Sequence, residues 1–446
     1  MSEIRIDLEH VTGPVRPLHG ICNGPISGTS EELFHYLGEA GIPYSRLHDT
    51  GGRYGGYVFV DIANIFRDFE ADADDPEAYD FPFTDWLLGA LAKQGVMPFY
   101  RLGATIENSC ALNAYRIIPP RDARKWAEIC AHIVAHYNEG WADGFRYGIK
   151  YWEIWNEPDN TPDMMTNPMW RGTKEQYFEL YEVTSRLLKA RFPDIKVGGY
   201  ASCGFYAIGD DGQRLSREAN VSPRMSYFLD FAEEFFAYIT SEEHRAPIDF
   251  FSWHSYGDAQ HNVLYAAYAR RLLERYGLGG VESILNEWNP GIANRGLLKD
   301  AALIAEMLCA MHSGSDVSMM NYYDGQVNTE YGGLFDPVHR RPFKAYYAFK
   351  AFDALYRLGS AVEVRVSGGR TAALAARCGQ ECAVLLVNPT ARAQDCRLEG
   401  LADGDMSLRL ICSRRNLTPA GSVHVSGGCA ELALGAYNVA LLSGSV

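Results

Sequence analysis

The chain has 446 residues, of which 47% are apolar and 22% charged, so it is expected to fold into a globular protein rather than to remain disordered. Its 41 basic and 56 acidic residues give a formal net charge of −15, a sign that makes nucleic acid and an anionic membrane surface poor partners. No stretch approaches the ~18 consecutive apolar residues of a membrane span, and the opening residues lack the layout of a signal peptide, so a cytoplasmic protein is expected unless a leader has been removed.

Residues 17–358 alternate short β-prone runs with helix-like segments. In the segment 121–137, for example, apolar residues recur at helical spacing from Trp126 to Tyr137. The eight β-prone runs span residues 18–25, 43–49, 96–103, 149–157, 195–201, 248–256, 282–288 and 317–323. Strand–helix alternation predicts a parallel sheet with right-handed crossovers, and eight such units fit a closed (β/α)₈ TIM barrel. The alternative is an open doubly wound sheet, but no G-x-G-x-x-G or Walker sequence follows an early strand.

Aromatic residues mark a boundary near residue 358. The chain holds 8 Trp, 27 Tyr and 21 Phe, and after Tyr356 there is one, Tyr437. Residues 359–446 read as short β-rich runs separated by Gly, Asn and Asp, which predicts a small antiparallel β-sandwich domain. Residues 1–16 are a possible added strand of that domain. With so few aromatic rings on which a ligand could stack, we expect the domain to pack against the barrel.

Two acidic residues stand at the ends of predicted strands. The fourth run ends in Asn156-Glu157 and the seventh in Asn286-Glu287, each among tryptophans. In a barrel the working residues gather at the carboxyl ends of the strands, so these glutamates are expected to meet at one mouth. A single glutamate in such a place is often a solvated, capped residue with no catalytic role. A pair of glutamates is typical of enzymes that cleave glycosidic bonds. In these enzymes one carboxyl group protonates the leaving oxygen, and a second, ionised one attacks or stabilises the sugar.

The two motifs also carry a resemblance. YWEIWNEPD followed by ILNEWN is similar to glycoside hydrolase family 39, which belongs to a clan of retaining (β/α)₈ glycosidases and includes β-xylosidases and α-L-iduronidases. His48-Asp49 after the second strand, WHSY at the sixth and the β-rich C-terminal region extend the similarity over most of the chain. The resemblance implies a barrel with a small accessory domain, and a glycosidase that keeps the anomeric configuration of its substrate.

The same resemblance implies roles for individual residues. Glu157 would be the acid/base and Glu287 the nucleophile, while Asn156 would bind the 2-hydroxyl of the sugar. Tyr256 would hydrogen-bond the nucleophile, and His254 would hold a sugar hydroxyl or the nucleophile. The remaining expected substrate contacts are His48, Asp49, Trp288, Tyr323 and Arg101.

Three positions allow more than one interpretation. Arg101 replaces an apolar residue expected in xylosidases, and it either clamps a carboxylate of the substrate or, as we favour, forms an ion pair with Glu107 or Asp49. Glu153 shares the strand parity of Glu157, but a buried partner of Arg46 is the better interpretation. Trp170, in the long segment after the fourth strand, is either a stacking platform or a hydrophobic plug.

We expect no cofactor and no metal, because no H-E-x-x-H or paired-histidine spacing occurs. The ten cysteines form no C-x-x-C motif, which indicates reduced thiols. The leading hypothesis is a retaining exo-glycoside hydrolase, most plausibly β-xylosidase-like, acting on an oligosaccharide or small glycoside. The alternatives are the same mechanism on an α-L-iduronide, galactoside or arabinoside, and a carbohydrate-binding pseudo-enzyme that does not cut its ligand. The oligomeric state cannot be predicted from the sequence.

Overall fold

Eight parallel strands close into a barrel in chain order, from β2 to β9. The computed structural model describes residues 1–26, 30–50, 60–106, 116–216, 221–327 and 331–446. The barrel strands are β2 Gly20–Cys22, β3 Tyr44–Leu47, β4 Met97–Leu102, β5 Tyr151–Ile154, β6 Lys196–Ser202, β7 Phe250–His254, β8 Glu282–Trp288 and β9 Met319–Tyr322. Pairing of β2 with β9, which sets Gly20 opposite Asn321, closes the cylinder. Each predicted β-prone run overlaps one of these strands, and the predicted (β/α)₈ barrel is confirmed.

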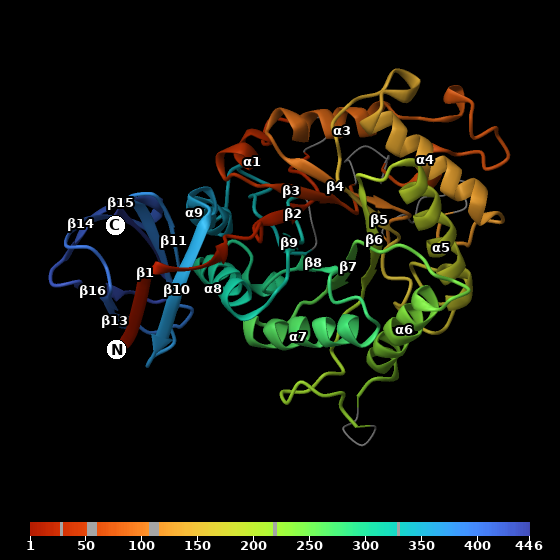
Figure 1. Cartoon of the computed structure of the whole chain (residues 1–446). Helices are drawn as coiled ribbons and strands as arrows, with labels where there is room; N and C mark the ends of the chain where they lie inside the picture. The colour runs from red at the N-terminus through yellow and green to blue at the C-terminus, as the bar shows by residue number, and fades with distance from the viewer. Residues whose placement is uncertain (27–29, 51–59, 107–115, 217–220, 328–330) are drawn as a thin grey trace.

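Helices surround the barrel on its outer face (Figure 1). Their apolar stripes face the strands; in α4, for example, Trp126 and Ile133 are buried. The α-helices are α1 His35–Glu39, α2 Ile62–Ile65, α3 Pro82–Lys93, α4 Ala123–Asn138, α5 Lys174–Arg191, α6 Pro223–Thr240, α7 Ala259–Arg275, α8 Leu298–Gly314 and α9 Lys344–Leu358. Short 3₁₀ turns are η1 Pro76–Ala78, η2 Trp141–Asp143 and η4 Ile292–Asn294. None of the helices in the described part of the chain is both long and apolar enough to cross a membrane.

The interior of the barrel is layered. Near the amino ends of the strands an apolar layer contains Phe99, Tyr151, Phe250, Ile284 and Met319. One step nearer the carboxyl ends, inward-facing positions turn polar: Glu153, Ser252 and Asn286 follow two residues after Tyr151, Phe250 and Ile284. The apolar layer closes the bottom of the cylinder, so a polar site can form at its mouth alone.

A nine-stranded sheet, antiparallel except for one pair, stands beside the barrel, and it contains both chain termini (Figure 1). Its strands are β1 Ser2–Pro14, β10 Ser360–Ser367, β11 Ala372–Cys378, β12 Glu381–Val387, β13 Gln394–Glu399, β14 Gly404–Cys412, β15 Arg415–Val425, β16 Cys429–Leu434 and β17 Val439–Ser445. The N-terminal strand β1 lies between β10 and β13, antiparallel to the first and parallel to the second. The predicted class of a TIM barrel with a C-terminal β-rich domain is therefore confirmed.

Strand β12 explains how the sheet joins the barrel. On one face of β12, Ala383, Leu385 and Val387 belong to the main core that includes α8 and α9. On the other face, Cys382, Val384 and Leu386 belong to a second core together with Ile4 and Ile6 of β1. A strand buried on both faces needs a continuous apolar run, which is what residues 382–387 supply. Helices α8 and α9 lie between the barrel and the sheet (Figure 1).

Candidate active site

Glu157 and Glu287 come together at the carboxyl ends of β5 and β8. One carboxylate oxygen of each lies within 4.8 Å of the other, and a ring nitrogen of His254 is within the same distance of both. The side chain of Glu157 is 16% exposed and that of Glu287 is 6% exposed. The two acids predicted from the sequence therefore share one small, mostly buried space.

Glu157 reaches this space through a left-handed turn after β5. Trp155 has φ = +75° and Glu157 has φ = +46°, conformations that cost energy for residues other than glycine. The backbone N–H of Glu157 donates to the carbonyl oxygens of Tyr200 and Ala201 at 3.2 and 3.1 Å, which holds the turn against β6. Strained backbone held in this way fixes the direction of the side chain.

A β-bulge in β8 turns Glu287 inward. Trp253 of β7 pairs with Leu285, but the next residue, His254, pairs with Glu287, so β8 has one extra residue at Asn286. Asn286 and Glu287 consequently both contact the barrel interior, through Glu153 and Arg46 respectively. The residue after them, Trp288, points outward, where its ring packs against Tyr322 and Phe349.

Arg46 of β3 joins the polar residues of the interior. Its guanidinium donates to Glu153 Oε2 and Glu287 Oε1, both at 2.7 Å, and to Asn156 Oδ1 at 2.6 Å. The carboxylates of Glu153 and Glu287 outweigh burial and raise the pKa of Arg46, so it is a permanent cation. The predicted Arg46–Glu153 pair is confirmed. Because a guanidinium only donates, the amide oxygen of Asn156 faces Arg46 and its Nδ2 is turned away.

His254 contacts both glutamates through the same nitrogen. Its Nδ1 is 2.7 Å from Glu157 Oε1 and 3.4 Å from Glu287 Oε2. Burial lowers the pKa of His254, but the carboxylates of Glu287 and Glu157 outweigh it and raise the pKa. Burial raises the pKa of Glu157, but hydrogen bonds from His254 and Asn160 outweigh it and lower the pKa. In the ligand-free protein the shared proton therefore rests on His254.

Tyr256 holds the other side of Glu287. Its hydroxyl donates to Glu287 Oε2 at 2.9 Å, in agreement with the predicted contact. The residue as a whole is 41% exposed, so its ring reaches the surface while its hydroxyl reaches the buried carboxylate. Glu287 thus receives one hydrogen bond from a cation and one from a neutral hydroxyl.

His48, Asp49 and Tyr323 form a second wall of the site. His48 Nε2 is 3.1 Å from Asp49 Oδ1 and 3.8 Å from Glu287 Oε1, and Tyr323 donates its hydroxyl to Asp49 Oδ2. Burial and the nearby Arg46 and Arg101 lower the pKa of His48 well below its usual value, so its ring is neutral. Substrate contacts of these residues stay a prediction.

Two of the expected substrate contacts are wrong for this structure. Trp288 has no exposed surface, because the β8 bulge turns it toward α9. Arg101 is also fully buried, and it donates to Asp61 Oδ1 at 2.5 Å and to Thr105 Oγ1 at 3.0 Å rather than facing a ligand. The expectation of an ion pair was right, but its partner is Asp61; Glu107 lies outside the described residues. Trp170 is a plug, 1% exposed and packed at 4.9 Å on Trp155.

Sequence reasoning missed two residues near Glu157. Asn160 donates its Nδ2 to Glu157 Oε2 at 2.9 Å, and Asp159 is buried against Ser202 and the backbone N–H of Cys203. Burial raises the pKa of Asp159 to about 7. Both lie directly after the Asn-Glu-Pro motif, but nothing in that motif tells which of the following side chains turns back toward the glutamate.

Metal-ligating groups meet at two places in the described part of the chain. One is the Glu157–His254–Glu287 cluster, and the other is the exposed group Asp7, His10 and Glu363 on the sheet. In the first cluster the carboxylate oxygens already accept hydrogen bonds from Arg46, Tyr256 and Asn160. This arrangement is suited to moving a proton between neighbouring oxygen and nitrogen atoms.

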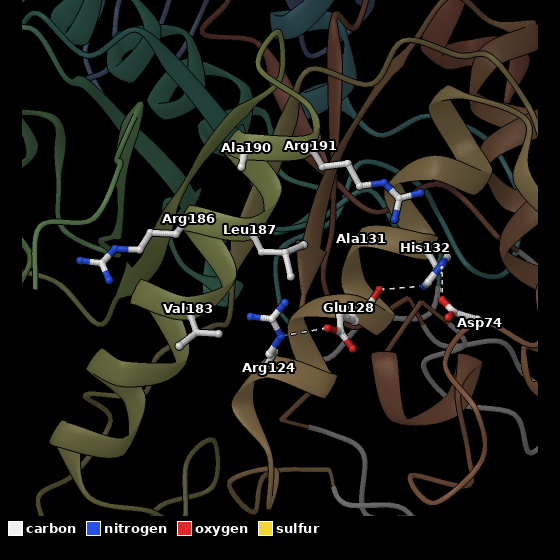
Figure 2. A pocket seen from close by; sticks show the side chains of 10 residues that line it. All are labelled: Asp74, Arg124, Glu128, Ala131, His132, Val183, Arg186, Leu187, Ala190 and Arg191. Atoms are coloured by element: carbon white, nitrogen blue, oxygen red, sulfur yellow. Dashed lines mark hydrogen bonds and ion pairs between the residues drawn. The ribbon is translucent and has the colours of Figure 1, made fainter.

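A separate groove of about 800 Å³ lies on the outside of the barrel, between α4 and α5 (Figure 2). Its apolar side is formed by Val183 and Leu187. Among its charged residues, Arg124 lies 3.1 Å from Glu128, and His132 lies 3.3 Å from Asp74. None of the strand-end residues described above lines this groove.

The site and fold agree with what comparisons with known proteins find. The family model of glycosyl hydrolases family 39 matches residues 38–284, more than half of the chain. The chain belongs to glycosyl hydrolases family 39. It is therefore a glycoside hydrolase, and its substrate is a glycoside.

Relatives of this family 39 chain include a β-xylosidase of Geobacillus stearothermophilus, 26% identical over 368 residues that make up 73% of this chain and 67% of the relative. Among solved structures, a glucosidase from Croceicoccus marinus has a TM-score of 0.78 at 20% identity, covering 99% of this chain and 98% of that one. A monomeric β-xylosidase from Caulobacter crescentus has a TM-score of 0.68 at 19% identity, covering 99% of both chains. The structural likenesses establish the shared fold.

Proposed function

We propose that this family 39 protein is a retaining exo-glycosidase of β-xylosidase type. The observation that carries the proposal is the close approach of Glu157 and Glu287, with oxygens within 4.8 Å of each other. Carboxyl groups about 5–5.5 Å apart are typical of retaining enzymes, whereas inverting enzymes need about 6.5–9.5 Å to admit a water molecule. The relative from Geobacillus stearothermophilus is a β-xylosidase, which favours xylose as the donor sugar.

In the first step, Glu287 attacks the anomeric carbon and forms a glycosyl ester. Arg46 and Tyr256, which donate to its two oxygens, hold the direction of this carboxylate. The proton on His254 Nδ1 passes over 2.7 Å to Glu157, and Glu157 gives it to the departing oxygen. The step ends with neutral His254, ionised Glu157 and esterified Glu287.

In the second step, ionised Glu157 removes a proton from water, and the resulting hydroxide oxygen attacks the anomeric carbon. Glu287 leaves as a carboxylate, so the sugar regains its original configuration. The returning charge on Glu287 favours the proton moving back from Glu157 to His254, because Glu287 is the main charge that raises the pKa of His254. The cycle then returns to its starting protonation state.

The burial of the site supports cleavage of a terminal sugar. Asn156, His48 and His254 are each at most 2% exposed, so the site is enclosed and suits one small saccharide. The neutral ring of His48 has a buried Nδ1 without a hydrogen-bond partner in the described part of the chain, and this atom can accept from a sugar hydroxyl. Asn156 Nδ2, directed away from Arg46, is the proposed donor to the 2-hydroxyl.

A nitrophenyl glycoside panel tests the donor sugar. We expect the highest kcat/KM on the β-D-xyloside, with β-D-glucoside, β-D-galactoside, α-L-arabinoside and α-L-iduronide compared at equal concentration. The β-D-glucoside belongs in the panel because the Croceicoccus marinus neighbour is a glucosidase. Proton NMR during turnover should detect the β-anomer of the product first; initial release of the α-anomer from a β-glycoside would contradict a retaining mechanism.

Variants of the two glutamates test their roles. Glu287→Gln should abolish turnover of every substrate, while Glu157→Ala should retain the first step on a 2,4-dinitrophenyl glycoside, which needs little protonation. A 2-deoxy-2-fluoro glycoside should label Glu287, detected by mass spectrometry of its peptide. Glu282→Gln is the matched control, because Glu282 lies at the opposite end of the same strand and pairs with Lys196. Full activity of both glutamate variants would refute the assignment.

A further inference from the structure

The carboxyl group of Glu157 is held at both oxygens by different donors. His254 Nδ1 lies 2.7 Å from Oε1, and Asn160 Nδ2 lies 2.9 Å from Oε2. Asn160 is three residues further along the same turn, where its backbone N–H donates to the carbonyl oxygen of Glu157 at 3.1 Å. Its side chain is buried, because the residue is 7% exposed. Rotation of the Glu157 carboxyl group would break both side-chain contacts.

Arg224 fixes the orientation of the Asn160 amide. Its Nε donates to the Asn160 carbonyl oxygen at 2.6 Å, and its Nη2 donates to Asn160 Oδ1 at 2.8 Å. A guanidinium has no acceptor, so Oδ1 must face Arg224 and the NH₂ group must face Glu157. Without Arg224, the amide could turn by half a rotation and place its oxygen against the carboxylate.

Arg224 comes from an element that contributes nothing else to the catalytic pair. It lies in the first turn of α6, and its guanidinium stands 5.5 Å from the centre of the Phe228 ring one turn later. The other groups that act on the charge of Glu157 are His254, Cys203, Asp159 and Glu287, which lie on or beside the strand ends. Arg224 therefore connects the turn after β5, which carries Glu157, with helix α6.

We propose that Asn160 and Arg224 are a positioning pair that holds the Glu157 carboxyl group in the direction required for proton transfer to the leaving group. The inference rests on the proposed acid/base role of Glu157. Neither residue touches the reacting atoms; Arg224 acts through Asn160, and Asn160 acts through Glu157. Their contribution should accordingly matter most when the leaving group needs a proton.

The main test compares leaving groups on one sugar. kcat/KM reports the first step alone, in which a phenyl leaving group depends on the acid and a 2,4-dinitrophenyl group does not. General acid catalysis raises the rate roughly 10²–10⁴-fold. We expect Asn160→Ala to lower kcat/KM about tenfold on the phenyl glycoside and much less on the dinitrophenyl glycoside. Loss by an equal factor on both substrates would overturn the proposal, because it would indicate a general structural effect.

Asn160→Asp separates positioning of Glu157 from simple anchoring of the loop. This change keeps the size of the side chain and its contacts to Arg224 but replaces the NH₂ donor by an oxygen. The basic limb of the kcat/KM–pH profile should move to higher pH, further than in Asn160→Ala, because a second carboxylate beside Glu157 disfavours its ionised form. A profile equal to that of the unchanged protein would mean that Asn160 only anchors the loop.

Arg224 gives variants that leave the core intact, since this residue is exposed at the start of α6. Arg224→Ala should reproduce the leaving-group dependence of Asn160→Ala, and Arg224→Lys should recover part of it, because lysine keeps the charge but not the two-pronged donation. Arg271→Ala is the matched control: Arg271 donates to the Gly212 carbonyl oxygen at 2.6 Å and so ties down a neighbouring loop with no contact to Glu157. It should leave the leaving-group dependence unchanged.

Glu157→Ala, measured on the same substrates, distinguishes the two ways to fail. If Glu157→Ala has no leaving-group dependence, the proposed role of Glu157 is wrong and the positioning pair falls with it. If Glu157→Ala has the dependence but neither the Asn160 nor the Arg224 variants have it, the positioning pair alone is overturned. Thermal unfolding of each variant identifies losses that come from misfolding, and the exposed Arg224 variants decide the question if the Asn160 variants do not fold.

Discussion

The Nδ1 atom of His254 lies 2.7 Å from the Oε1 atom of Glu157, so one proton serves both side chains. The directions of the two pKa shifts, upward for His254 and downward for Glu157, place that proton on the imidazole before substrate binds. In the proposed mechanism, the acid is therefore the pair rather than the carboxyl group alone. A pair of this kind titrates as one unit, and its pH dependence changes when either member is removed.

His254→Phe should move the basic limb of the kcat/KM–pH profile to lower pH. In the unchanged protein the proton rests on His254, whose pKa the carboxylates of Glu287 and Glu157 raise against the effect of burial. Without the imidazole, Glu157 alone holds the proton and loses it in the lower pH range of a carboxyl group, and kcat falls because this group has lost a hydrogen bond. His136→Phe is the control, since His136 is buried on α4 and contacts Asp85 at 3.0 Å, away from the mouth. A basic limb that moves to higher pH would contradict the interpretation.

Arg46→Met should destabilise the protein and impair catalysis together. Removing one partner of a buried ion pair costs about 3–5 kcal/mol, because the remaining charge is left without compensation. Arg46 has two carboxylate partners, Glu153 and Glu287, both nearly or fully buried. Urea denaturation should therefore give a free energy of unfolding lower by at least this amount. An unchanged free energy of unfolding would mean that the charges are solvated.

The double variant Arg46→Met/Glu153→Gln separates stability from catalysis. Glu153 is fully buried, and neutralising it removes one of the two carboxylate charges that the loss of Arg46 leaves without compensation. We expect the free energy of unfolding to recover partly while turnover stays low, because Glu287 still lacks its cationic donor. If the stability loss of the double variant equals the sum of the losses in Arg46→Met and Glu153→Gln, the two residues do not belong to one network.

Much of the barrel could be predicted from the sequence because its strands are short apolar runs followed by helical periodicity. Strands of the C-terminal sheet with the same apolar character, such as β12, can be predicted in the same way. Strands β11 and β16 cannot, since the alanines of β11 and the Ala-Glu-Leu composition of β16 favour helices. There the pairing with neighbouring strands, not intrinsic propensity, decides the structure.

At the site, the sequence motifs located the two glutamates and Tyr256 but not the directions of all their neighbours. The bulge that turns Trp288 outward depends on the pairing of β7 with β8 and has no signature in the run 282–288. Contacts between distant segments were equally hidden. Arg101 meets Asp61, and Asn160 meets Arg224, across 40 and 64 positions of sequence respectively. A single sequence holds no information on which polar side chains meet at such separations.

Tyr256→Phe should lower kcat/KM by roughly 10–100-fold. The hydroxyl donates to Glu287 Oε2 at 2.9 Å, and a hydrogen bond to a charged group contributes about 1.5–3 kcal/mol. The loss should be similar for phenyl and dinitrophenyl leaving groups, because Glu287, as the proposed nucleophile, acts on both. Tyr181→Phe is the control, since its hydroxyl donates to the Pro247 carbonyl oxygen in the outer helical layer. A loss confined to the phenyl glycoside would assign Tyr256 to the acid instead.

Asp159 and Asp300 should make the protein less stable as pH rises from about 4 to 7. Burial raises the pKa of each from 3.8 to about 7, so the folded protein holds a proton that the unfolded chain releases above its own pKa. The free energy of unfolding falls with rising pH wherever the folded state binds more protons than the unfolded chain, and it becomes constant again above the pKa of the folded state. A gap of about three pKa units corresponds to on the order of 4 kcal/mol for each group.

Asp159→Asn tests this sign, because the amide has the size of the acid but no proton to lose in this range. Its free energy of unfolding relative to the unchanged protein should increase from pH 4 to pH 7 and then stay level, as measured by urea denaturation at fixed ionic strength. Asp300→Asn should behave in the same way. In the double variant these two positions should make no contribution to the pH dependence of the free energy of unfolding between pH 4 and pH 7. A relative stability that instead decreases between pH 4 and pH 7 would mean that both carboxyl groups are ionised in the folded protein, held by the hydrogen bonds from Ser202 and from the backbone N–H of Gly296.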